Sequence, residues 1–148
     1  MPSKPDQLSK PEKLKYHAEL LSNRVKKRFA HLCKKFKKQN IDCFRLYDWD
    51  IPEIRAVVDW YAGHVVVGEY VRWQTGEEWL GQMASAVALA LKVPQQNVHI
   101  RRRQTKTEDG PRYRKIGSKG KRFEVRERDL KFLVNIRPLL DVFIFHMK

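Results

Sequence analysis

The chain has 148 residues and a formal net charge of +14, with 31 lysines and arginines against 17 acidic residues. This length suits one compact domain, and a hydrophobic content of 42% is too high for a wholly disordered chain. No apolar run approaches the ~20 residues of a membrane span, and so much positive charge favours a polyanionic partner, most often nucleic acid.

The first residues (1–12) are expected to form a flexible lead-in without the apolar segment of a secretory signal. Two cysteines, Cys33 and Cys43, lie ten residues apart without the spacing of a zinc site. This pattern indicates reduced structural thiols in a cytoplasmic protein, and no metal site is predicted.

A long amphipathic helix is predicted next. Apolar residues recur at spacings of three and four, which places one apolar stripe along a helix: Leu14, Ala18, Leu21, Val25, Phe29, Leu32 and Phe36. Ser9 and Glu12 have the spacing of a capping box, and Pro11 is tolerated in a first turn. The opposite face is basic, with ten lysines and arginines between residues 13 and 40 against one acid, Glu19. Such a face is either simply solvated or binds a polyanion.

The rest of the chain alternates strands with one further helix. Apolar runs bounded by turn residues predict strands at residues 43–47, 55–61, 64–70, 98–103, 122–126 and 130–136. Ala62-Gly63 connects the second and third of these as a hairpin, and a helix is expected over residues 75–91, ended by Pro94. The predicted fold is α+β: a mostly antiparallel sheet, one packed helix and a long basic N-terminal helix, in a single module over residues 13–137.

Residues 44–53 read FRLYDWDIPE and hold the one arrangement of carboxylates that resembles an active site. Asp48 and Asp50 lie two apart, and such a pair can bind a divalent ion or share a proton. Aspartate close to proline is also common turn chemistry, and no other acid, histidine or lysine of suitable spacing accompanies the pair. We expect these two residues to shape the loop and to offset Arg45 and Arg55 rather than to catalyse.

A second basic segment covers residues 99–122, with ten lysines and arginines against Glu108 and Asp109. Arginine forms bidentate bonds to phosphate and tyrosine can stack on a base, whereas the alternative is a sheet edge protected by charge. The density of arginine favours binding. The residues expected to contact RNA are Arg101, Arg102, Arg103, Lys106, Arg112, Tyr113, Arg114 and Lys115, with Lys34, Lys35, Lys37 and Lys38 as a secondary set.

Four runs of the sequence carry a resemblance to a known family: LLSNRVKKRFAHL, IDCFRLYDWDIPEIRAVVDWYAGHVVVGEY, RYRKIG and FEVRERDLKFLVNI. They span about residues 14–136 and resemble the region ahead of the catalytic domain in S-adenosylmethionine-dependent 23S rRNA guanine methyltransferases, in particular the second half of the bifunctional large-subunit enzyme. In that family the region is a small module that helps to grip the RNA. The resemblance implies 23S rRNA as the partner and S-adenosylmethionine as the cofactor of the full enzyme.

The resemblance also implies a role for this chain. After residue 136 the run RPLLDVFIFHMK departs from the family pattern, where a catalytic domain is expected to begin, and the chain has no glycine-rich cofactor motif. We therefore expect an rRNA-binding accessory module, truncated or split from its catalytic domain, with no catalytic or cofactor-binding residue of its own. The alternatives are a methyltransferase subunit completed by a separately encoded domain and a stand-alone ribosome-associated protein.

The final run, residues 138–148, is strongly apolar. Leaving such side chains in water forfeits about 1.5–3 kcal/mol each relative to burial. The run is therefore expected to fold back on the sheet, to pair with a second copy or to aggregate, and self-association through it is the outcome we expect.

Overall fold

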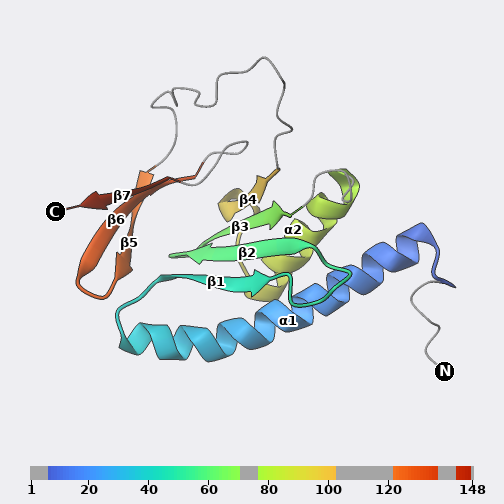
Figure 1. Cartoon of the computed structure of the whole chain (residues 1–148), viewed down its shortest axis with the longest axis horizontal. Coiled ribbons are helices and arrows are strands. Elements are labelled where there is room, and N and C mark those ends of the chain that lie inside the picture. Colours follow the sequence, from blue (N-terminus) through green and yellow to red (C-terminus); the bar gives the residue numbers. More distant parts are fainter. Residues whose placement is uncertain (1–6, 71–76, 103–121, 137–142, 148) are drawn as a thin grey trace, which may run out of the picture.

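The computed structural model describes residues 7–70, 77–102, 122–136 and 143–147 of the chain (Figure 1). Within these ranges the elements follow one another as α1 (Lys10–Lys38), β1 (Cys43–Asp48), β2 (Ala56–Tyr61), β3 (His64–Glu69), α2 (Glu77–Leu91), a 3-10 turn (Gln95–Asn97), β4 (Val98–Arg101), β5 (Arg122–Glu127), β6 (Leu130–Asn135) and β7 (Phe143–Met147).

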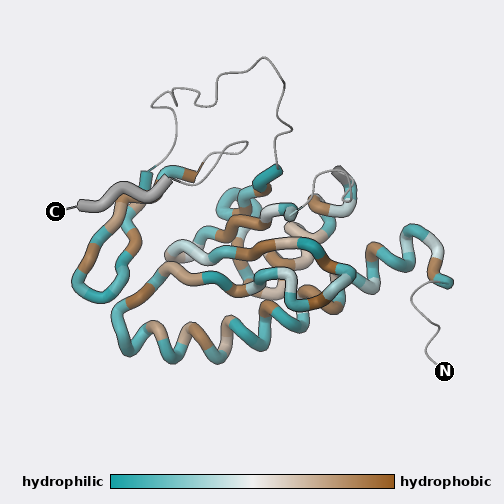
Figure 2. The backbone as a smooth tube through the Cα atoms, viewed as in Figure 1, coloured by the Kyte–Doolittle hydropathy of each residue, from teal (hydrophilic) through white to brown (hydrophobic). Residues whose placement is uncertain are grey.

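Helix α1 forms as the sequence predicts. At its start the Glu12 carboxylate accepts hydrogen bonds from the Ser9 backbone N–H at 2.8 Å and from the Ser9 hydroxyl at 2.7 Å. Leu21 and Val25 are its fully buried residues, and Figure 2 shows short hydrophobic stretches recurring between hydrophilic ones along the helix. Beyond its end, Asn40 takes a left-handed φ of 58° that turns the chain toward β1.

The hairpin predicted at Ala62-Gly63 is confirmed. Both residues have positive φ, 47° at Ala62 and 93° at Gly63, as the tightest hairpin turns require. A second hairpin joins β5 to β6 through Arg128 and Asp129, and Arg128 also has a positive φ of 59°. Local turn chemistry therefore sets both connections.

The described strands form two sheets, whereas the sequence predicted a single mostly antiparallel sheet. The first sheet has the order β1-β2-β3-β4, antiparallel except for the parallel pair β3–β4, which pairs Val65 with Val98. Helix α2 makes the crossover that a parallel pair needs. The second sheet, β5-β6-β7, is antiparallel throughout. The α+β class is confirmed.

The main core lies between the two helices and the first sheet (Figure 1). Leu21 of α1 and Met83 of α2 meet strand residues such as Val58 in one buried cluster. At the periphery, the indole N–H of Trp79 donates to Nδ1 of His17 at 3.1 Å, which joins the two helices. Helix α1 is thus a packed structural element as well as the carrier of a basic face.

Strand β3 is buried on both sides. Val65 and Val67 belong to the main core, whereas Val66 between them packs with Val125 and Val134 of the second sheet. Alternation along a strand sends successive side chains to opposite faces. The second sheet therefore covers the face of β3 that the helices leave open.

Hydrogen bonds also fasten the α1–β1 connection to the second sheet. The Asp42 carboxylate accepts the Arg126 backbone N–H at 2.5 Å, and the Asp42 backbone N–H donates to the Arg126 carbonyl at 3.1 Å. The Asn40 side-chain amide donates to the Arg128 carbonyl at 2.8 Å, and the Arg128 backbone N–H donates back to the Asn40 carbonyl at 3.1 Å. We call these four bonds the Asn40–Asp42 clamp.

The apolar run at the end of the sequence supplies a strand. Residues 143–147 fold back as β7 and pair antiparallel with β6, with Leu133 opposite Phe145. Of the outcomes expected for this run, folding back on a sheet is the one found for these residues. Self-association stays a prediction, and residues 138–142 lie outside the described part of the chain.

Candidate nucleic-acid interface

Among the residues that the structure describes, positive charge is concentrated along α1. Eight exposed basic side chains in its second half form what we call the α1 basic face: Arg24, Lys26, Lys27, Arg28, Lys34, Lys35, Lys37 and Lys38. The stripe of apolar residues on the other side of the helix holds this face outward because it is anchored in the core. The four lysines expected to form a secondary RNA contact all belong to it.

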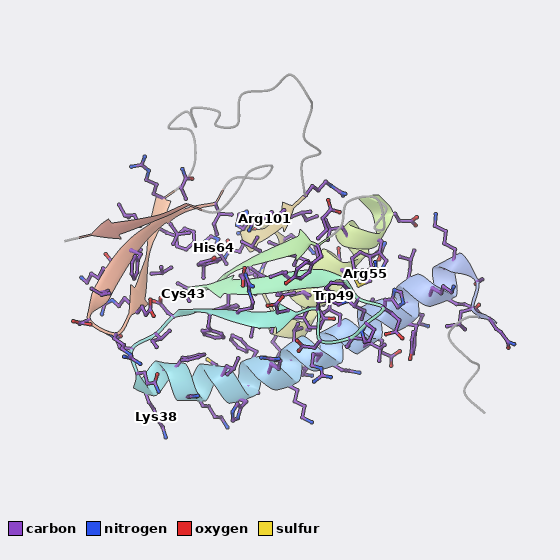
Figure 3. The ribbon with its side chains drawn as sticks, viewed as in Figure 1. Lys38, Cys43, Trp49, Arg55, His64 and Arg101 are labelled. Carbon is purple, nitrogen blue, oxygen red and sulfur yellow. The ribbon has the colours of Figure 1, made fainter. Side chains whose placement is uncertain are left out.

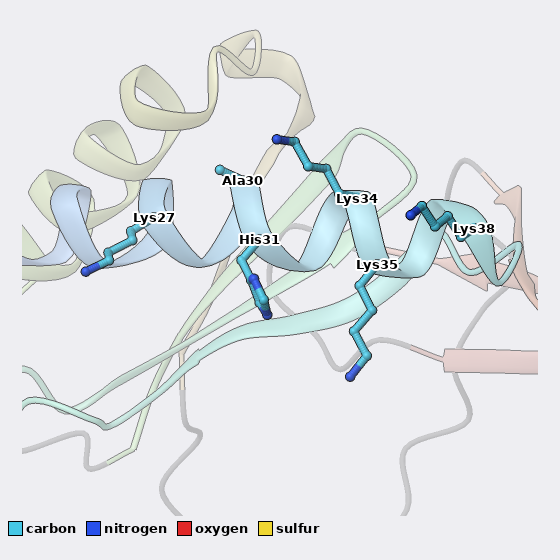
Figure 4. Close-up of a pocket in the computed structure, with 6 residues that line it drawn as sticks. All are labelled: Lys27, Ala30, His31, Lys34, Lys35 and Lys38. Carbon is cyan, nitrogen blue, oxygen red and sulfur yellow. The ribbon is translucent and has the colours of Figure 1, made fainter.

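Part of this face surrounds an open hollow of about 440 Å³ (Figure 4). Its lining comes entirely from one side of α1: Lys27, Ala30, His31, Lys34, Lys35 and Lys38. These positions follow one another at helical spacing, and Ala30 leaves the space between the longer side chains. Such an open, cation-lined surface suits a phosphate backbone better than an enclosed small molecule.

Few carboxylates offset the α1 basic face. Arg28 pairs with Asp50 at 2.7 Å between Nη1 and Oδ2, and at the start of the helix Lys10 lies 3.7 Å from Glu78. In the described ranges, no carboxylate lies at ion-pair distance from the lysines around the hollow. Several like charges held close together repel one another and attract a polyanion that brings compensating charge.

The arginines expected as primary contacts are described only in part. Arg101 is exposed on β4, where its aliphatic stem lies beside Gly68 of β3, and Arg102 follows it half-buried. A Cβ placed at Gly68 would meet the Arg101 Cβ at 3.6 Å, so the glycine gives this side chain room. The other six predicted contacts lie outside the described residues: Arg103, Lys106, Arg112, Tyr113, Arg114 and Lys115.

The two basic segments lie at different places on the molecule. Strand β4 is one edge of the first sheet, whereas α1 packs beside β1 at the opposite edge. Figure 3 accordingly shows Arg101 near the β4 edge and Lys38 at the end of α1. An RNA that contacts both must therefore extend around the sheet.

Asp48 and Asp50 do not act as a pair. Trp49 between them has a left-handed φ of 49°, and each aspartate has its own cation. Arg45 Nη1 lies 3.3 Å from Asp48, and Arg28 lies 2.7 Å from Asp50. The pKa of Asp48 is lowered, first by a hydrogen bond from the Tyr70 hydroxyl and then by Arg45. Both carboxylates serve the loop, as predicted, although the partner of Asp50 is Arg28 rather than Arg55.

Sequence reasoning missed a cluster in the same loop. The Arg55 guanidinium lies 5.3 Å from the centroid of the Trp49 ring, and the rings of Trp49 and Tyr70 lie 5.2 Å apart. Trp49 keeps 40% of its surface exposed. The run YDWD places Trp49 in the loop, and Arg55 lies at the end of the same loop, but Tyr70 comes from beyond β3. We call Trp49, Arg55 and Tyr70 the Trp49 cluster.

The two cysteines, Cys33 and Cys43, are half-buried. Both are free thiols, and burial raises the pKa of Cys43 to about 11, so that it stays protonated at neutral pH. Among the described residues, no group of three or more histidines, cysteines and acids could hold a metal ion. None of the helices in this part of the chain has the length and apolarity needed to cross a lipid bilayer.

The sequence is similar to segments of curated proteins. No protein-family model matches it. A protein from Alcanivorax borkumensis is 35% identical over 86% of this chain and 19% of its own length. Proteins from Pseudomonas putida and Pseudomonas aeruginosa are 34% and 32% identical, over 94% and 93% of this chain and 20% and 19% of theirs. These curated homologues are named ribosomal RNA large subunit methyltransferase K/L.

The resemblance inferred from the sequence is thus confirmed at the level of homologous segments, and the chain spans about a fifth of the length of the K/L relatives it matches. Among solved structures, a candidate methyltransferase complexed with SAH aligns with a TM-score of 0.48 at 14% identity, over 87% of this chain and 31% of that one. A candidate S-adenosylmethionine-dependent methyltransferase from Streptococcus mutans aligns with a TM-score of 0.47 at 15% identity, over 87% and 32%.

Proposed function

We propose that this chain is the rRNA-binding module of an enzyme like its K/L relatives. The enzyme as a whole would methylate guanine in large-subunit rRNA. In this proposal the module grips the RNA, and methyl transfer belongs to another part of such an enzyme. The observation that carries the proposal is the α1 basic face, whose lysines surround an open hollow and have no carboxylate at ion-pair distance among the described residues.

Counterion release supplies the driving force. Each phosphate that a lysine neutralises frees condensed cations, so affinity falls steeply as salt is added. The lysines rise along α1 at about 5.4 Å per turn, which spreads them beside a backbone instead of gathering them around one phosphate. The exposed arginine on β4 then offers a second point of contact.

Binding of rRNA fragments, followed by fluorescence anisotropy over a range of salt concentrations, tests this proposal. Replacing Lys34, Lys35 and Lys38 by alanine should weaken binding and make the log–log salt slope shallower by about two to three. The matched control replaces three lysines at the other end of the same helix, Lys10, Lys13 and Lys15, and removes the same charge. Equal losses in the two variants would reduce the effect to net charge, and wild-type protein that binds no rRNA fragment would refute the proposal.

The proposal also assigns cofactor binding to another part of the enzyme. The sequence lacks the glycine-rich strand-to-helix turn on which such cofactors commonly rest. Titration of the chain with S-adenosylmethionine in a calorimeter should therefore give no heat of binding at micromolar concentrations. A micromolar affinity would instead favour a subunit that takes part in methyl transfer.

A further inference from the structure

Trp49 is an exposed aromatic residue that is nevertheless held in place. Its indole N–H donates to the Pro52 carbonyl at 3.2 Å, and its ring contacts Arg55 and Tyr70. Even with these neighbours, 40% of the residue remains exposed. A fixed aromatic surface of this kind loses little conformational entropy when a ligand covers it.

The fold maintains this arrangement at a cost. Trp49 has a left-handed φ of 49°, a conformation that residues other than glycine adopt under strain. Burial does not compensate, because the side chain lies at the surface. Strained backbone and exposed aromatic rings are both enriched where proteins bind ligands.

The surroundings of the Trp49 cluster suit a nucleic acid. The two flanking carboxylates are offset, since Asp48 is paired with Arg45 and Asp50 with Arg28. Arg55 adds a further positive charge directly beside the ring. The cluster therefore presents an aromatic surface beside cations, and the neighbouring aspartates do not repel a phosphate backbone unopposed.

The cluster also continues the α1 basic face. The Arg28–Asp50 ion pair joins the loop to the helix at 2.7 Å, and Arg28 adjoins Lys27 at one end of the hollow. Figure 3 shows Trp49 and Arg55 together beside the middle of α1. A strand whose phosphates lie along the lysines would thus pass the indole ring.

We propose that the Trp49 cluster is a stacking site for an unpaired base of RNA held on the α1 basic face. Every base has a π-face that can stack on indole, and a neighbouring arginine adds cation–π attraction. The site selects unpaired nucleotides, because bases within a helix are already stacked and their faces are covered. This inference rests on the proposed function and adds the class of RNA that the module prefers.

Affinity for two RNA probes with equal numbers of phosphates tests the site: a stem–loop with an unpaired loop and a fully paired duplex. Trp49→Ala should weaken stem–loop binding by about tenfold or more and change duplex binding by less than about twofold. Trp49→Phe should retain most of the stem–loop affinity. Tyr16→Ala is the matched control, since Tyr16 is 39% exposed on α1, and it should change neither affinity.

The outcomes separate the two proposals. Wild-type protein that binds neither probe refutes the proposed function, whereas Trp49→Ala protein that binds the stem–loop as tightly as wild type refutes the stacking site alone. If Trp49→Ala protein melts at the wild-type temperature, equal weakening for both probes also refutes stacking. In the unaltered protein, a photoreactive uridine in the RNA loop should crosslink to Trp49. Crosslinks confined to other residues would contradict the site. Protection of Trp49 by a protein partner in the absence of RNA would also contradict it.

Discussion

Nδ1 of His64 on β3 lies 3.3 Å from Nε2 of His99 on β4, and the His64 ring stacks on Phe123 of β5 with 4.2 Å between ring centroids. Such a bond between imidazoles needs one ring nitrogen to donate and the other to accept. The three rings therefore connect β3 and β4 of the first sheet to β5 of the second. Because two charged imidazoles would both be donors, the bond requires that the two histidines are not both charged.

This contact predicts a loss of stability in mild acid. Burial, and next the neighbouring His64, lower the pKa of His99 from its ordinary value of 6.5, and burial likewise lowers that of His17. At these two sites the unfolded chain binds protons before the folded chain does, so their contribution to the free energy of unfolding is fully present above about pH 6.5 and is lost as the pH drops below it. Urea unfolding at about pH 7.5 and pH 5 measures the difference.

A His99→Asn variant should show a shallower pH dependence of unfolding, because it removes one of the two described histidines whose pKa is lowered. His31→Asn removes the same kind of side chain from an exposed position on α1 and serves as the control. A His99→Asn profile that matched wild type would place the acid sensitivity elsewhere.

The side chain of Tyr47 is hydrogen-bonded to the backbone of the loop between β1 and β2. The side chain is fully buried; its hydroxyl accepts the Ile51 backbone N–H at 3.1 Å and donates to the Ile54 carbonyl at 2.8 Å. Tyr47→Phe would leave both backbone groups without this partner and should lower the free energy of unfolding by about 1–3 kcal/mol. Tyr16→Phe, at an exposed hydroxyl, should change it by less than about 0.5 kcal/mol in the same urea titration.

Salt dependence tests the contribution of β4. If about four to six phosphates are engaged, the log–log slope of affinity against salt should lie at about −3 to −5. Replacing Arg101, Arg102 and Arg103 by alanine should flatten that slope, whereas the Lys10, Lys13 and Lys15 variant should keep it. An unchanged slope in the arginine variant would remove the β4 edge from the interface and leave α1 as the binding face.

Strand β7 covers the outer edge of β6. Removing residues 137–148 would leave the backbone groups of β6 unpaired on that side, and open edges invite pairing between molecules. The sequence alone predicted the reverse, self-association through this run, but because β7 occupies the edge within the molecule we expect the shortened chain to self-associate more than the full chain in sedimentation velocity runs. Leu133→Lys in the shortened chain should reverse the effect, because charge on an edge opposes pairing. A monomeric shortened chain would show that the β6 edge needs no cover.

The sequence could predict the features that depend on residues close together in the chain, but not those that depend on distant residues. Helix α1 and its Ser9–Glu12 cap depend on residues a few positions apart, and so does the turn at Ala62-Gly63, which is why periodicity and turn chemistry identified them. The split into two sheets depends on which face of β3 each side chain occupies. Val65 and Val66 look alike in sequence, yet they belong to different cores.

The candidate interface divides in the same way. The α1 basic face could be inferred from the periodicity of the sequence, because lysines opposite a buried apolar stripe must face water. Neither the ion pair between Arg28 and Asp50 nor the approach of Tyr70 to Trp49 is encoded locally, since both cross 20 residues or more of chain. The stacking cluster could therefore be found only once the strands were in place.

The Asn40–Asp42 clamp has a consequence for the order of folding. Its side-chain bonds join positions 84 and 88 residues apart, whereas the β2–β3 hairpin closes over a two-residue turn. Closing a long loop costs more conformational entropy than closing a short one. The clamp should therefore form after the β2–β3 hairpin and open before it. The backbone amides of Asp42 and Arg128 should therefore exchange with deuterium earlier than those of β2 and β3, and the second sheet should detach as a unit while the helices still cover the first.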